Sequence, residues 1–417
     1  MSAIKLGDFI TLQRGTTYKG QLLGQDGAVL IGLASIQREG GFRDDKLETY
    51  GGECPEKISL RAGDLYVSLK DITNDGHLLG AVARIPEKIK LGRLTQDTVK
   101  LVFLKDEFPR NYIYWLLRTP QCRNYCRSLQ TGTTNLGLGR EDFLSFQVPL
   151  LTDFSSSIVE SLEAIEKKIE NLKRQNETLE QIARSLFKHW FIDFEFPNAD
   201  GKPYKSSGGA MFASAIGDIP EGWKVSTIGD EVETVGGGTP STTEPSYWEN
   251  GDILWYSPTD LTKAKTLFSI NSEKKITKLG LQKSSAKLFP KYSLLLTSRA
   301  TIGEVTINTK EACTNQGFIT IIPNTKFSVY FLYGWLLTKI GVIKQLASGS
   351  TFPEISKTNF RGLDFLIPVS NILEKYEHLI KPLYTKIETN IFQIQTLTKT
   401  RDSLLPKLMS GQLRVKE

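Results

Sequence analysis

The strongest constraint on the fold is an internal repeat that extends through most of the 417 residues. Short sequences from the first half return in the second half, in the same order and 217 to 223 residues later. The matching pairs are Gly7-Asp8 with Gly229-Asp230, Gly15-Thr16 with Gly238-Thr239, Leu79-Gly80-Ala81-Val82 with Ile302-Gly303-Glu304-Val305, Trp115-Leu116-Leu117 with Trp335-Leu336-Leu337, Gly132-Thr133-Thr134 with Gly349-Ser350-Thr351, and Val148-Pro149 with Ile367-Pro368. A separation that drifts so little indicates one ancestral unit, duplicated within the chain. We therefore expect two similar domains and a partner that offers two similar binding places.

Composition is that of an ordinary soluble protein. With 40% hydrophobic and 24% charged residues, the chain can bury the cores of two to three domains. The longest apolar stretch, residues 330–337, is too short to span a bilayer, and residues 1–15 lack the apolar core of a secretory signal. We therefore expect a cytoplasmic protein that has no membrane segment. The net charge of +6 favours a polyanionic partner.

The cysteines and histidines predict neither a disulfide framework nor a metal site. Of the four cysteines, Cys122 and Cys126 lie one helical turn apart, without a nearby histidine. The three histidines, His77, His189 and His378, are scattered. We expect His189, near the end of a predicted helix, to be a packing residue rather than a ligand.

Each half predicts an α+β domain followed by one long helix. Short β-branched and aromatic runs, separated by Gly, Asp and Pro, indicate the strands. Predicted strands include residues 28–33, 65–69, 81–85, 99–104, 294–297, 304–307 and 318–322, and predicted short helices are residues 111–118 and 330–338. The expected organisation is a first domain at residues 1–152, a long helix at 153–196, a linker at 197–222, a second domain at 223–369 and a second long helix at 370–417.

The two long helices carry the spacing of a coiled coil. Their apolar residues alternate by four and three, which keeps one narrow stripe facing a partner helix. The stripes are Ile158, Leu162, Ile165, Ile169, Leu172, Asn176, Leu179, Ala183 and Leu186, and Ile380, Leu383, Ile387, Asn390, Ile394, Leu397, Arg401, Leu404 and Leu408. Asn176 and Asn390 are polar residues within the stripes, and such residues can fix register. The alternative is that each helix only covers its own domain.

Antiparallel pairing of these helices would make the halves equivalent under a pseudo-two-fold axis. The 29 residues from Ile158 to Leu186 form a helix of about 43 Å, slightly longer than one turn of B-DNA at ~34 Å. Two domains held that far apart would contact two half-sites on one face of a duplex. The spacer between the half-sites would go unread.

Four stretches resemble a known family. They are residues 186–194 (LFKHWFIDF), 200–209 (DGKPYKSSGG), 217–223 (GDIPEGW) and 401–413 (RDSLLPKLMSGQL). The first three are similar to the central conserved region of the specificity subunit of type I restriction-modification enzymes, and the fourth to the distal conserved helix of that family. The resemblance covers the whole architecture, although the recognition domains of the family vary widely in sequence.

The resemblance implies a DNA-reading subunit without a catalytic site of its own. Each globular domain would be a target-recognition domain for half of a split DNA sequence. The helices would set the spacer and dock two methyltransferase subunits, and restriction subunits that translocate DNA would join the complex. S-adenosylmethionine, ATP and magnesium would belong to these partners. The sequence contains no methyltransferase Asn-Pro-Pro-Phe motif, no P-loop and no Gly-x-Ser-x-Gly elbow.

Candidate docking residues lie at the helix ends. They are Phe187, Trp190, Phe191, Leu404 and Leu408. The alternative for the aromatic cluster is that it packs the helix onto a globular domain.

A basic segment in the second domain is the best sequence evidence for DNA contact. Between residues 263 and 299, one acid, Glu273, stands against nine basic residues. They are Lys263, Lys265, Lys274, Lys275, Lys278, Lys283, Lys287, Lys291 and Arg299. Such an excess is typical of phosphate neutralisation, although a solvated charged face gives the same pattern. In the first domain the candidates Arg14, Lys19, Arg38, Arg43 and Lys70 are interleaved with acids.

The repeated glycine-containing loops are the candidate base-reading elements. Base reading needs short polar side chains and arginines that can enter a groove. The candidates are Thr16, Thr17, Tyr18, Thr131, Thr133, Thr134, Asn135, Thr239, Ser241, Ser298, Ser350 and Thr351, with Arg299. Asn315-Gln316 could add contacts, but Gln96 occupies the place of Gln316 and a shared residue can be structural. The alternative is that these loops are conformational turns kept by both halves.

Two other classes of function are open to this sequence. Asp260 with Glu273-Lys274-Lys275 fits the loose spacing of a magnesium-dependent nuclease. However, Glu166-Lys167-Lys168 shows the same triplet within a coiled-coil helix. The other class is a scaffold that binds only protein, which would show no salt-sensitive DNA binding.

Overall fold

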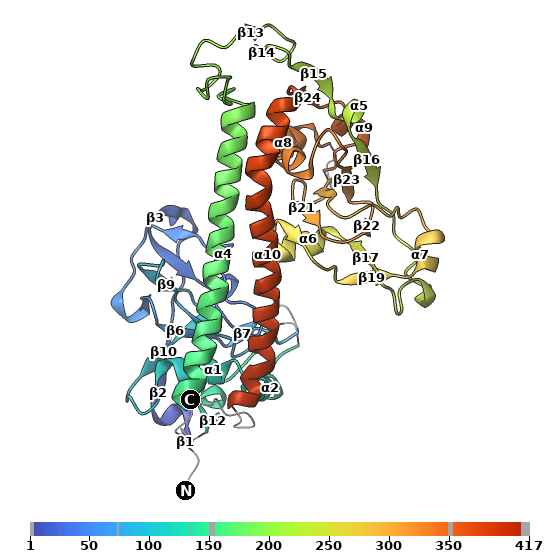
Figure 1. Cartoon of the computed structure of the whole chain (residues 1–417). Helices are drawn as coiled ribbons and strands as arrows, with labels where there is room; N and C mark the ends of the chain where they lie inside the picture. Colours follow the sequence, from blue (N-terminus) through green and yellow to red (C-terminus); the bar gives the residue numbers. More distant parts are fainter. Residues whose placement is uncertain (1–3, 73–74, 134, 150–154, 349–352, 410–417) are drawn as a thin grey trace. The chain divides into compact units, whose positions relative to one another are not determined.

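The structure, a computed structural model, describes residues 4–72, 75–133, 135–149, 155–348 and 353–409. The chain divides into two compact units. The first unit contains residues 1–167 and 397–417, and the second contains residues 168–396. The long helices α4 (Ser155–Phe191) and α10 (Ser370–Met409) each contribute residues to both units (Figure 1).

The first unit contains two four-stranded sheets. One sheet has the antiparallel order β2-β10-β6-β8, and the other has the order β4-β3-β9-β5 with β3 parallel to β9. The strands are β1 (Ile4–Lys5), β2 (Ile10–Arg14), β3 (Leu23–Ile31), β4 (Thr49–Tyr50), β5 (Ser59–Leu60), β6 (Leu65–Ser68), β7 (Lys70–Asp71), β8 (Val82–Arg84), β9 (Gly92–Leu94), β10 (Thr98–Phe103), β11 (Leu136–Gly137) and β12 (Gln147–Val148). The α-helices are α1 (Arg110–Leu117), α2 (Pro120–Ser128) and α3 (Arg140–Leu144).

The second unit contains a five-stranded and a three-stranded sheet. Their orders are β16-β23-β20-β21-β18 and β19-β17-β22, with β17 parallel to β22. The strands are β13 (Met211–Phe212), β14 (Ile219–Pro220), β15 (Lys224–Thr227), β16 (Glu233–Gly236), β17 (Ile253–Tyr256), β18 (Phe268–Ser269), β19 (Lys274–Ile276), β20 (Leu294–Thr297), β21 (Val305–Asn308), β22 (Ala312–Thr314), β23 (Phe318–Ile322) and β24 (Asp364–Ile367). The α-helices are α5 (Ile228–Glu231), α6 (Pro258–Ala264), α7 (Lys278–Gln282), α8 (Val329–Leu346) and α9 (Lys357–Arg361).

The two units repeat one topology, which confirms the predicted α+β repeat. The order β2-β10-β6-β8 returns as β16-β23-β20-β21, and the parallel pair β3–β9 returns as β17–β22. The pairing of β1 with β12 likewise returns as β15 with β24. The units differ at the sheet edges, where β5 joins the smaller sheet of the first unit and β18 joins the larger sheet of the second. They also differ in one connection, because residues 69–81 between β6 and β8 outnumber residues 298–304 between β20 and β21.

In each unit, segments of the two long helices pack against each other. In the second unit Asn390 Nδ2 donates a hydrogen bond to Asn176 Oδ1 at 2.8 Å, and the rings of Phe187 and Tyr376 meet with centroids 6.1 Å apart. Rising numbers on α4 therefore meet falling numbers on α10, so the pairing is antiparallel. In the first unit Arg401 Nη1 lies 2.6 Å from Glu166 Oε2.

The stripes bury residues that alternate as predicted. Ile169, Leu172, Ile380 and Ile387 are buried in the second unit, and Leu162 is buried in the first. The helices also cover their domains, since Leu162 belongs to the core of the first unit and Ile380 to that of the second. The coiled-coil stripe and the domain-covering alternative therefore both describe these helices.

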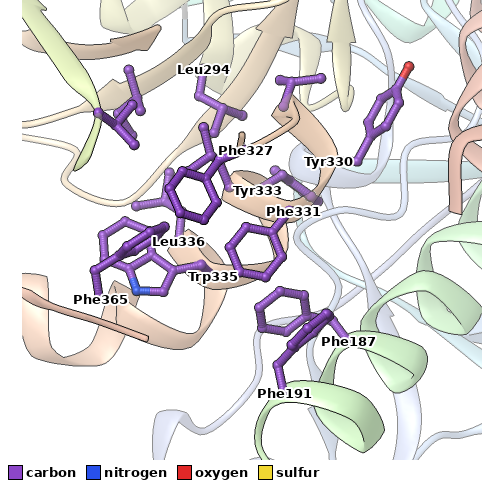
Figure 2. Packing of buried hydrophobic residues seen from close by; sticks show 14 of the residues in the cluster. Phe187, Phe191, Leu294, Phe327, Tyr330, Phe331, Tyr333, Trp335, Leu336 and Phe365 are labelled. Atoms are coloured by element: carbon purple, nitrogen blue, oxygen red, sulfur yellow. The ribbon is translucent and has the colours of Figure 1, made fainter. Parts of the chain in front are cut away.

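The core of the second unit is built around aromatic rings on α4 and α8. Figure 2 shows Phe187 and Phe191 of α4 pointing toward Phe331 of α8. Helix α8 is capped at its start by Ser328, whose side chain accepts a hydrogen bond from the Phe331 backbone N–H. Its Gly334 faces Phe187 so closely that a Cβ there would lie 2.2 Å from a ring carbon. The glycine therefore lets α4 and α8 pack ring against backbone.

The segment predicted as a linker, residues 197–222, is partly folded onto the second unit. It contains the paired strands β13 and β14. Tyr204 stacks on Phe196 with ring centroids 4.6 Å apart, and Phe196 stacks on Trp223 at 5.2 Å. A stretch rich in Gly, Ser and Pro thus gains order from three aromatic side chains. Helix α4 ends at Phe191, six residues before Pro197.

Among the residues that the structure describes, no helix has the length and apolar character that crossing a bilayer would require.

Candidate nucleic-acid interface

In the first unit, four polar segments meet at one surface, which we name the first loop face. It consists of loop 14–19, turn 95–97, Lys70, and residues 131–137 apart from Thr134. Arg14 Nε donates to Gln96 O at 2.9 Å, and Lys70 Nζ lies 3.0 Å from Asp97 Oδ1. The strand pair β7–β11 places Gly137 opposite Lys70. Most of the candidate contacts of this domain therefore share one surface.

The side chains of loop 14–19 and its neighbours are available to a partner. The exposed candidates are Arg14, Thr16, Thr17, Tyr18, Lys19, Lys70, Thr131, Thr133 and Asn135. Thr134 lies outside the described residues.

A buried arginine that was not predicted from the sequence holds loop 14–19 in place. Arg93 is 5% exposed. Its guanidinium donates to Thr16 Oγ1 and Thr17 O at 3.0 Å each and to Glu53 O at 2.9 Å. The guanidinium lies 4.9 Å from the centroid of the Tyr50 ring. Each donor thus fixes an acceptor in the loop or beside it.

The second unit has an equivalent surface, the second loop face. It consists of loop 236–241, turn 314–317, Arg299, and Ser348 with Glu354. Gly238 N donates to Thr314 O at 2.8 Å, and Thr239 Oγ1 donates to Gln316 Oε1 at 2.6 Å. Arg299 Nε lies 3.8 Å from Glu354 Oε2. Ser350 and Thr351, candidates in the same segment, lie outside the described residues.

Two tryptophans hold the loop of the second unit, where Arg93 holds that of the first. Trp255 Nε1 donates to Gly238 O and Trp248 Nε1 donates to Ser241 O, both at 2.9 Å. The two indoles meet edge to face with centroids 5.1 Å apart. The halves therefore fix the same backbone feature with different side chains.

The loop glycines are required by packing. A Cβ at Gly15 would lie 2.2 Å from Thr95 O, and one at Gly237 would lie 2.0 Å from Asn315 O. These distances are far below van der Waals contact, so only glycine lets the loop approach the turn. The glycines are thus needed for the conformation of the loops, which agrees with the alternative that these loops are conformational turns. The exposed hydroxyls and amides beside them remain candidates for DNA contact.

The two remaining candidate cations of the first unit are paired with acids of the same unit. Arg38 Nη2 lies 3.3 Å from Asp75 Oδ2, and Arg43 forms an ion pair with Asp45. In the second unit Lys263 pairs with Glu273. Lys265, Lys274, Lys275, Lys278, Lys283, Lys287 and Lys291 are exposed.

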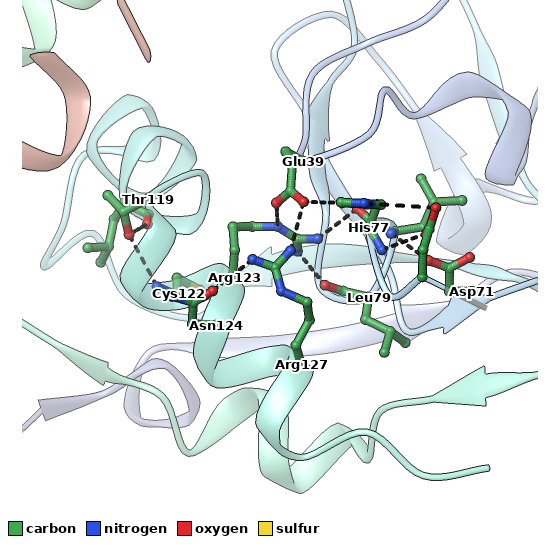
Figure 3. A network of polar contacts seen from close by, with 12 residues as sticks. Glu39, Asp71, His77, Leu79, Thr119, Cys122, Arg123, Asn124 and Arg127 are labelled. Atoms are coloured by element: carbon green, nitrogen blue, oxygen red, sulfur yellow. Dashed lines mark hydrogen bonds and ion pairs between the residues drawn. The ribbon is translucent and has the colours of Figure 1, made fainter. Parts of the chain in front are cut away.

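A carboxylate links three segments beside the first loop face (Figure 3). Glu39 Oε2 accepts a hydrogen bond from Arg123 Nε at 3.2 Å, and Glu39 Oε1 accepts one from Arg127 Nη1 at 2.7 Å and contacts His77 Nδ1. Arg123, 1% exposed, also donates to His77 O and Leu79 O. The network therefore ties the β6–β8 connection, which is longer in this unit, to helix α2.

Glu39 should make the stability of the chain sensitive to acid. Burial raises its pKa, but the hydrogen bond with His77 and the charges of Arg123 and Arg127 lower it more, so the net pKa falls below the usual 4.5. A depressed carboxyl pKa contributes stability above the unfolded-state pKa and loses it as pH falls through the folded-state pKa. We expect Glu39→Gln to destabilise the chain by about 1–2 kcal/mol at pH 7, a value reduced by its partial exposure.

Urea unfolding of the full chain at pH 7 and at pH 3 checks this expectation. The stability difference between wild type and Glu39→Gln should shrink as the pH falls below about 4.5. Glu87→Gln, at an exposed acid of the same unit, is the matched control and should change little. A difference that is the same at both pH values would show that the Glu39 charge does not stabilise the network.

The structure contradicts several candidate site residues. Ser298 is 2% exposed, and its backbone bridges Gly317 and Ile355, so its side chain is not available to DNA. Phe187, Trp190 and Phe191 are buried in the core of the second unit and are not available to a methyltransferase. These rings lie on the sides of the coiled-coil stripe, which widens the apolar face of α4 toward the domain.

The other helix-end and helix-surface candidates have different positions. Leu404 is half-buried at the edge of the first unit's core, and the side chain of Leu408 lies outside the described residues. His189, for which we expected a packing role, is exposed.

The acids of the nuclease pattern have structural partners. Asp260 Oδ2 accepts from Ser257 N and Oγ at 2.8 and 2.7 Å, and its Oδ1 accepts from Glu273 N at 2.7 Å. The carboxylate therefore caps α6 and joins it to the residue that precedes β19. Within the part of the chain that the structure describes, no three His, Cys, Asp or Glu side chains are grouped to hold a metal ion. The pattern thus has a structural explanation.

Comparison with known proteins assigns the family. A family model described as the type I restriction modification DNA specificity domain matches residues 220–398. The MjaIX specificity subunit of a type I restriction enzyme from Methanocaldococcus jannaschii is 30% identical over 328 residues, which cover 78% of this chain and 73% of the relative. The HindI specificity subunit of a type I restriction enzyme from Haemophilus influenzae is 25% identical over 323 residues, which cover 65% of this chain and 69% of the relative.

A solved structure supports the fold. The S subunit of a type I restriction-modification system from M. genitalium matches with a TM-score of 0.57 and 16% identity, over 98% of this chain and 95% of that chain. At that identity the likeness concerns the fold alone. The relative from M. jannaschii carries the assignment, together with the family model: this chain belongs to the specificity subunits of type I restriction-modification enzymes, the non-catalytic subunits that recognise the DNA target.

Proposed function

We propose that this specificity subunit reads a bipartite DNA target, with one half-site for each unit. The observation that carries the proposal is that the same surface occurs twice. Each loop face combines a glycine-containing loop, a turn that bears an exposed glutamine, and a basic residue. The basic residue follows β6 in the first unit and β20 in the second. The paired residues are Gln96 with Gln316 and Lys70 with Arg299.

The side chains of these faces suit the edges of bases. Glutamine can pair with adenine through two hydrogen bonds, and arginine with guanine. Gln96 and Arg14 of the first face, and Gln316 and Arg299 of the second, are exposed. Nearby exposed hydroxyls such as Thr16 and Thr17 suit phosphate oxygens, which position a protein without reading sequence.

The two long helices would set the spacer between the half-sites. Helix α4 has 37 residues and α10 has 40, and both continue from one unit into the other. At 1.5 Å per residue, α4 alone measures about 55 Å. The Asn176–Asn390 hydrogen bond lies within the seam and would fix the register, because a slip would leave both amides without a partner.

The internal duplication also favours two copies of one partner. We propose that two methyltransferase subunits dock on this subunit, and that restriction subunits which translocate DNA join that complex. In this proposal S-adenosylmethionine, ATP and magnesium are held by those partners. Two similar halves suit two identical partners because each half offers an equivalent surface.

Insertion of one heptad into each long helix tests the proposal. We expect seven residues added after Asn176, and seven added before Asn390, to lengthen the unread spacer by up to about three base pairs, because each insertion adds about 10 Å of helix. The sequences of both half-sites should stay the same. The measurement is methylation-site sequencing of genomic DNA from a host that carries the variant in its assembled enzyme.

A control insertion separates this effect from general damage. The same seven residues placed after Gly208, in a turn where a Cβ would meet no neighbour, should leave the target unchanged. An altered half-site with an unaltered spacer would contradict the proposed division between reading domains and helices. Methylation of a short continuous target would contradict bipartite reading altogether.

A further inference from the structure

The two units differ sharply in charge over equivalent segments. Residues 253–299, from β17 to Arg299, contain nine Lys and Arg against two Asp and Glu. The equivalent residues 23–70, from β3 to Lys70, contain six against eight. The same part of the fold is therefore strongly basic in the second unit and slightly acidic in the first.

Four lysines of the basic segment lie on β19, on α7 and after α7, and we name them the lysine patch. Lys274 lies on β19 with its Nζ 5.6 Å from the centroid of Trp248, the residue that holds Ser241 O. Lys278 begins α7 and Lys283 follows it. Lys287 comes two residues after Ser285, whose Oγ would lie 2.3 Å from a Cβ at Gly238. Lys274 and Lys287 thus lie next to residues that hold or contact loop 236–241.

The charges of the patch are available to a partner. All four side chains are exposed. Within the described ranges, no ion pair is formed by Lys278, Lys283 or Lys287. In the equivalent segment of the first unit, by contrast, three of the six basic residues, Arg38, Arg43 and Lys70, pair with acids of that unit. Cations without acidic partners can neutralise phosphates without first breaking an internal ion pair.

We infer that the lysine patch binds backbone phosphates of DNA beside the second half-site, and that the two halves therefore hold DNA unequally. The second unit supplies most of the salt-dependent affinity and makes the first encounter, because an unpaired basic surface attracts the polyanion at a distance. The first unit contributes chiefly through its base contacts. The inference rests on the proposed bipartite reading and adds a division of labour between the two half-sites.

Salt titration of DNA binding tests the inference. The assembled methyltransferase complex would be titrated with a fluorescent target duplex from 50 to 300 mM NaCl, and log K plotted against log salt. Each phosphate contact contributes a slope of ~0.9. The variant with Lys274, Lys278, Lys283 and Lys287 all changed to Gln should therefore lose about 2–4 units of slope. Glutamine keeps most of the side chain, and circular dichroism with thermal unfolding would show that the variant folds.

Lys275 is the matched control. It lies on the same strand as Lys274 and is also exposed, but successive side chains of a strand point to opposite faces. Lys275→Gln should leave the slope nearly unchanged, well below the ~0.9 of a single phosphate contact. A slope that is unchanged in the quadruple variant would overturn the inference. A loss of slope in Lys275→Gln as large as the share of one patch lysine would also overturn it.

A second experiment separates this inference from the proposed function. Duplexes would carry either the first or the second half-site with its flanks, and the duplex with the second half-site should show the steeper salt dependence. Equal slopes would overturn the unequal division even when methylation-site sequencing finds a split target. A target that is not split would instead contradict the proposed function, whatever the slopes.

Discussion

Replacing Gly334 by alanine is expected to lower the melting temperature of the full chain by about 5–10 °C. The new Cβ would lie 2.2 Å from Cδ2 and 2.6 Å from Cγ of Phe187, so the ring has to move. Phe187 is 4% exposed and packs on Phe191 and Phe331, so it has little free space. Overpacking of a filled core costs about 1–3 kcal/mol, and about 3 kcal/mol shifts a unit of this size by that range.

A second glycine in the same helix is the matched control. Gly341 is also in α8, but it is exposed and a Cβ there would meet no neighbour within 4 Å. Gly341→Ala should therefore stabilise the helix by about 0.5–1 kcal/mol, because alanine has the higher helix propensity. Thermal unfolding of the two variants should give shifts of opposite sign. Two shifts of the same sign would show that the contact with Phe187 does not decide the outcome.

Arg93→Met is expected to abolish discrimination at the first half-site and to destabilise the chain by about 3 kcal/mol. Methionine fills a similar volume but cannot donate to Thr16 Oγ1, Thr17 O or Glu53 O, which the guanidinium now satisfies. Each partly buried acceptor without a donor costs about 1 kcal/mol or more. Without this anchor, loop 14–19 loses its defined position in the first loop face.

The measurement is methylation of duplexes that carry single base changes in one half-site or the other. The Arg93→Met enzyme should tolerate changes in the first half-site and still reject changes in the second. Arg61→Met makes the same substitution at an exposed position of the same unit and should leave both preferences intact. Equal loss of preference at both half-sites would show that Arg93 acts on the whole chain rather than on its own loop.

The sequence predicts those features of the fold that are encoded by spacing. The internal repeat follows from the nearly constant separation of the repeated sequences. The helix seam follows from a four-and-three alternation that includes Asn176 and Asn390. Strands such as β20 and β23 are found at the predicted residues because each is a short apolar run between turn residues. Local pattern is sufficient for these features.

The anchors of the candidate interface could not be predicted in this way. Arg93 meets Thr16 across 77 positions of sequence, and no local pattern distinguishes it from an exposed arginine. Trp255 likewise reaches Gly238 O only because the sheet that contains β17 brings the two residues together. The aromatic cluster was different, because Trp190 and Phe191 lie beside the predicted stripe. Together with the stripe they form an apolar face wider than a coiled coil needs, which indicates that α4 also packs on a domain.

The position of β19 gives the lysines on it another consequence. The strand lies at the end of its sheet, with β17 as its hydrogen-bonded neighbour, so its outer backbone groups can pair with a strand from another molecule. Lys274 and Lys275 place positive charge on this border, and two copies approaching through it would repel each other. Self-association of this chain should accordingly rise when the lysine charges on β19 are neutralised.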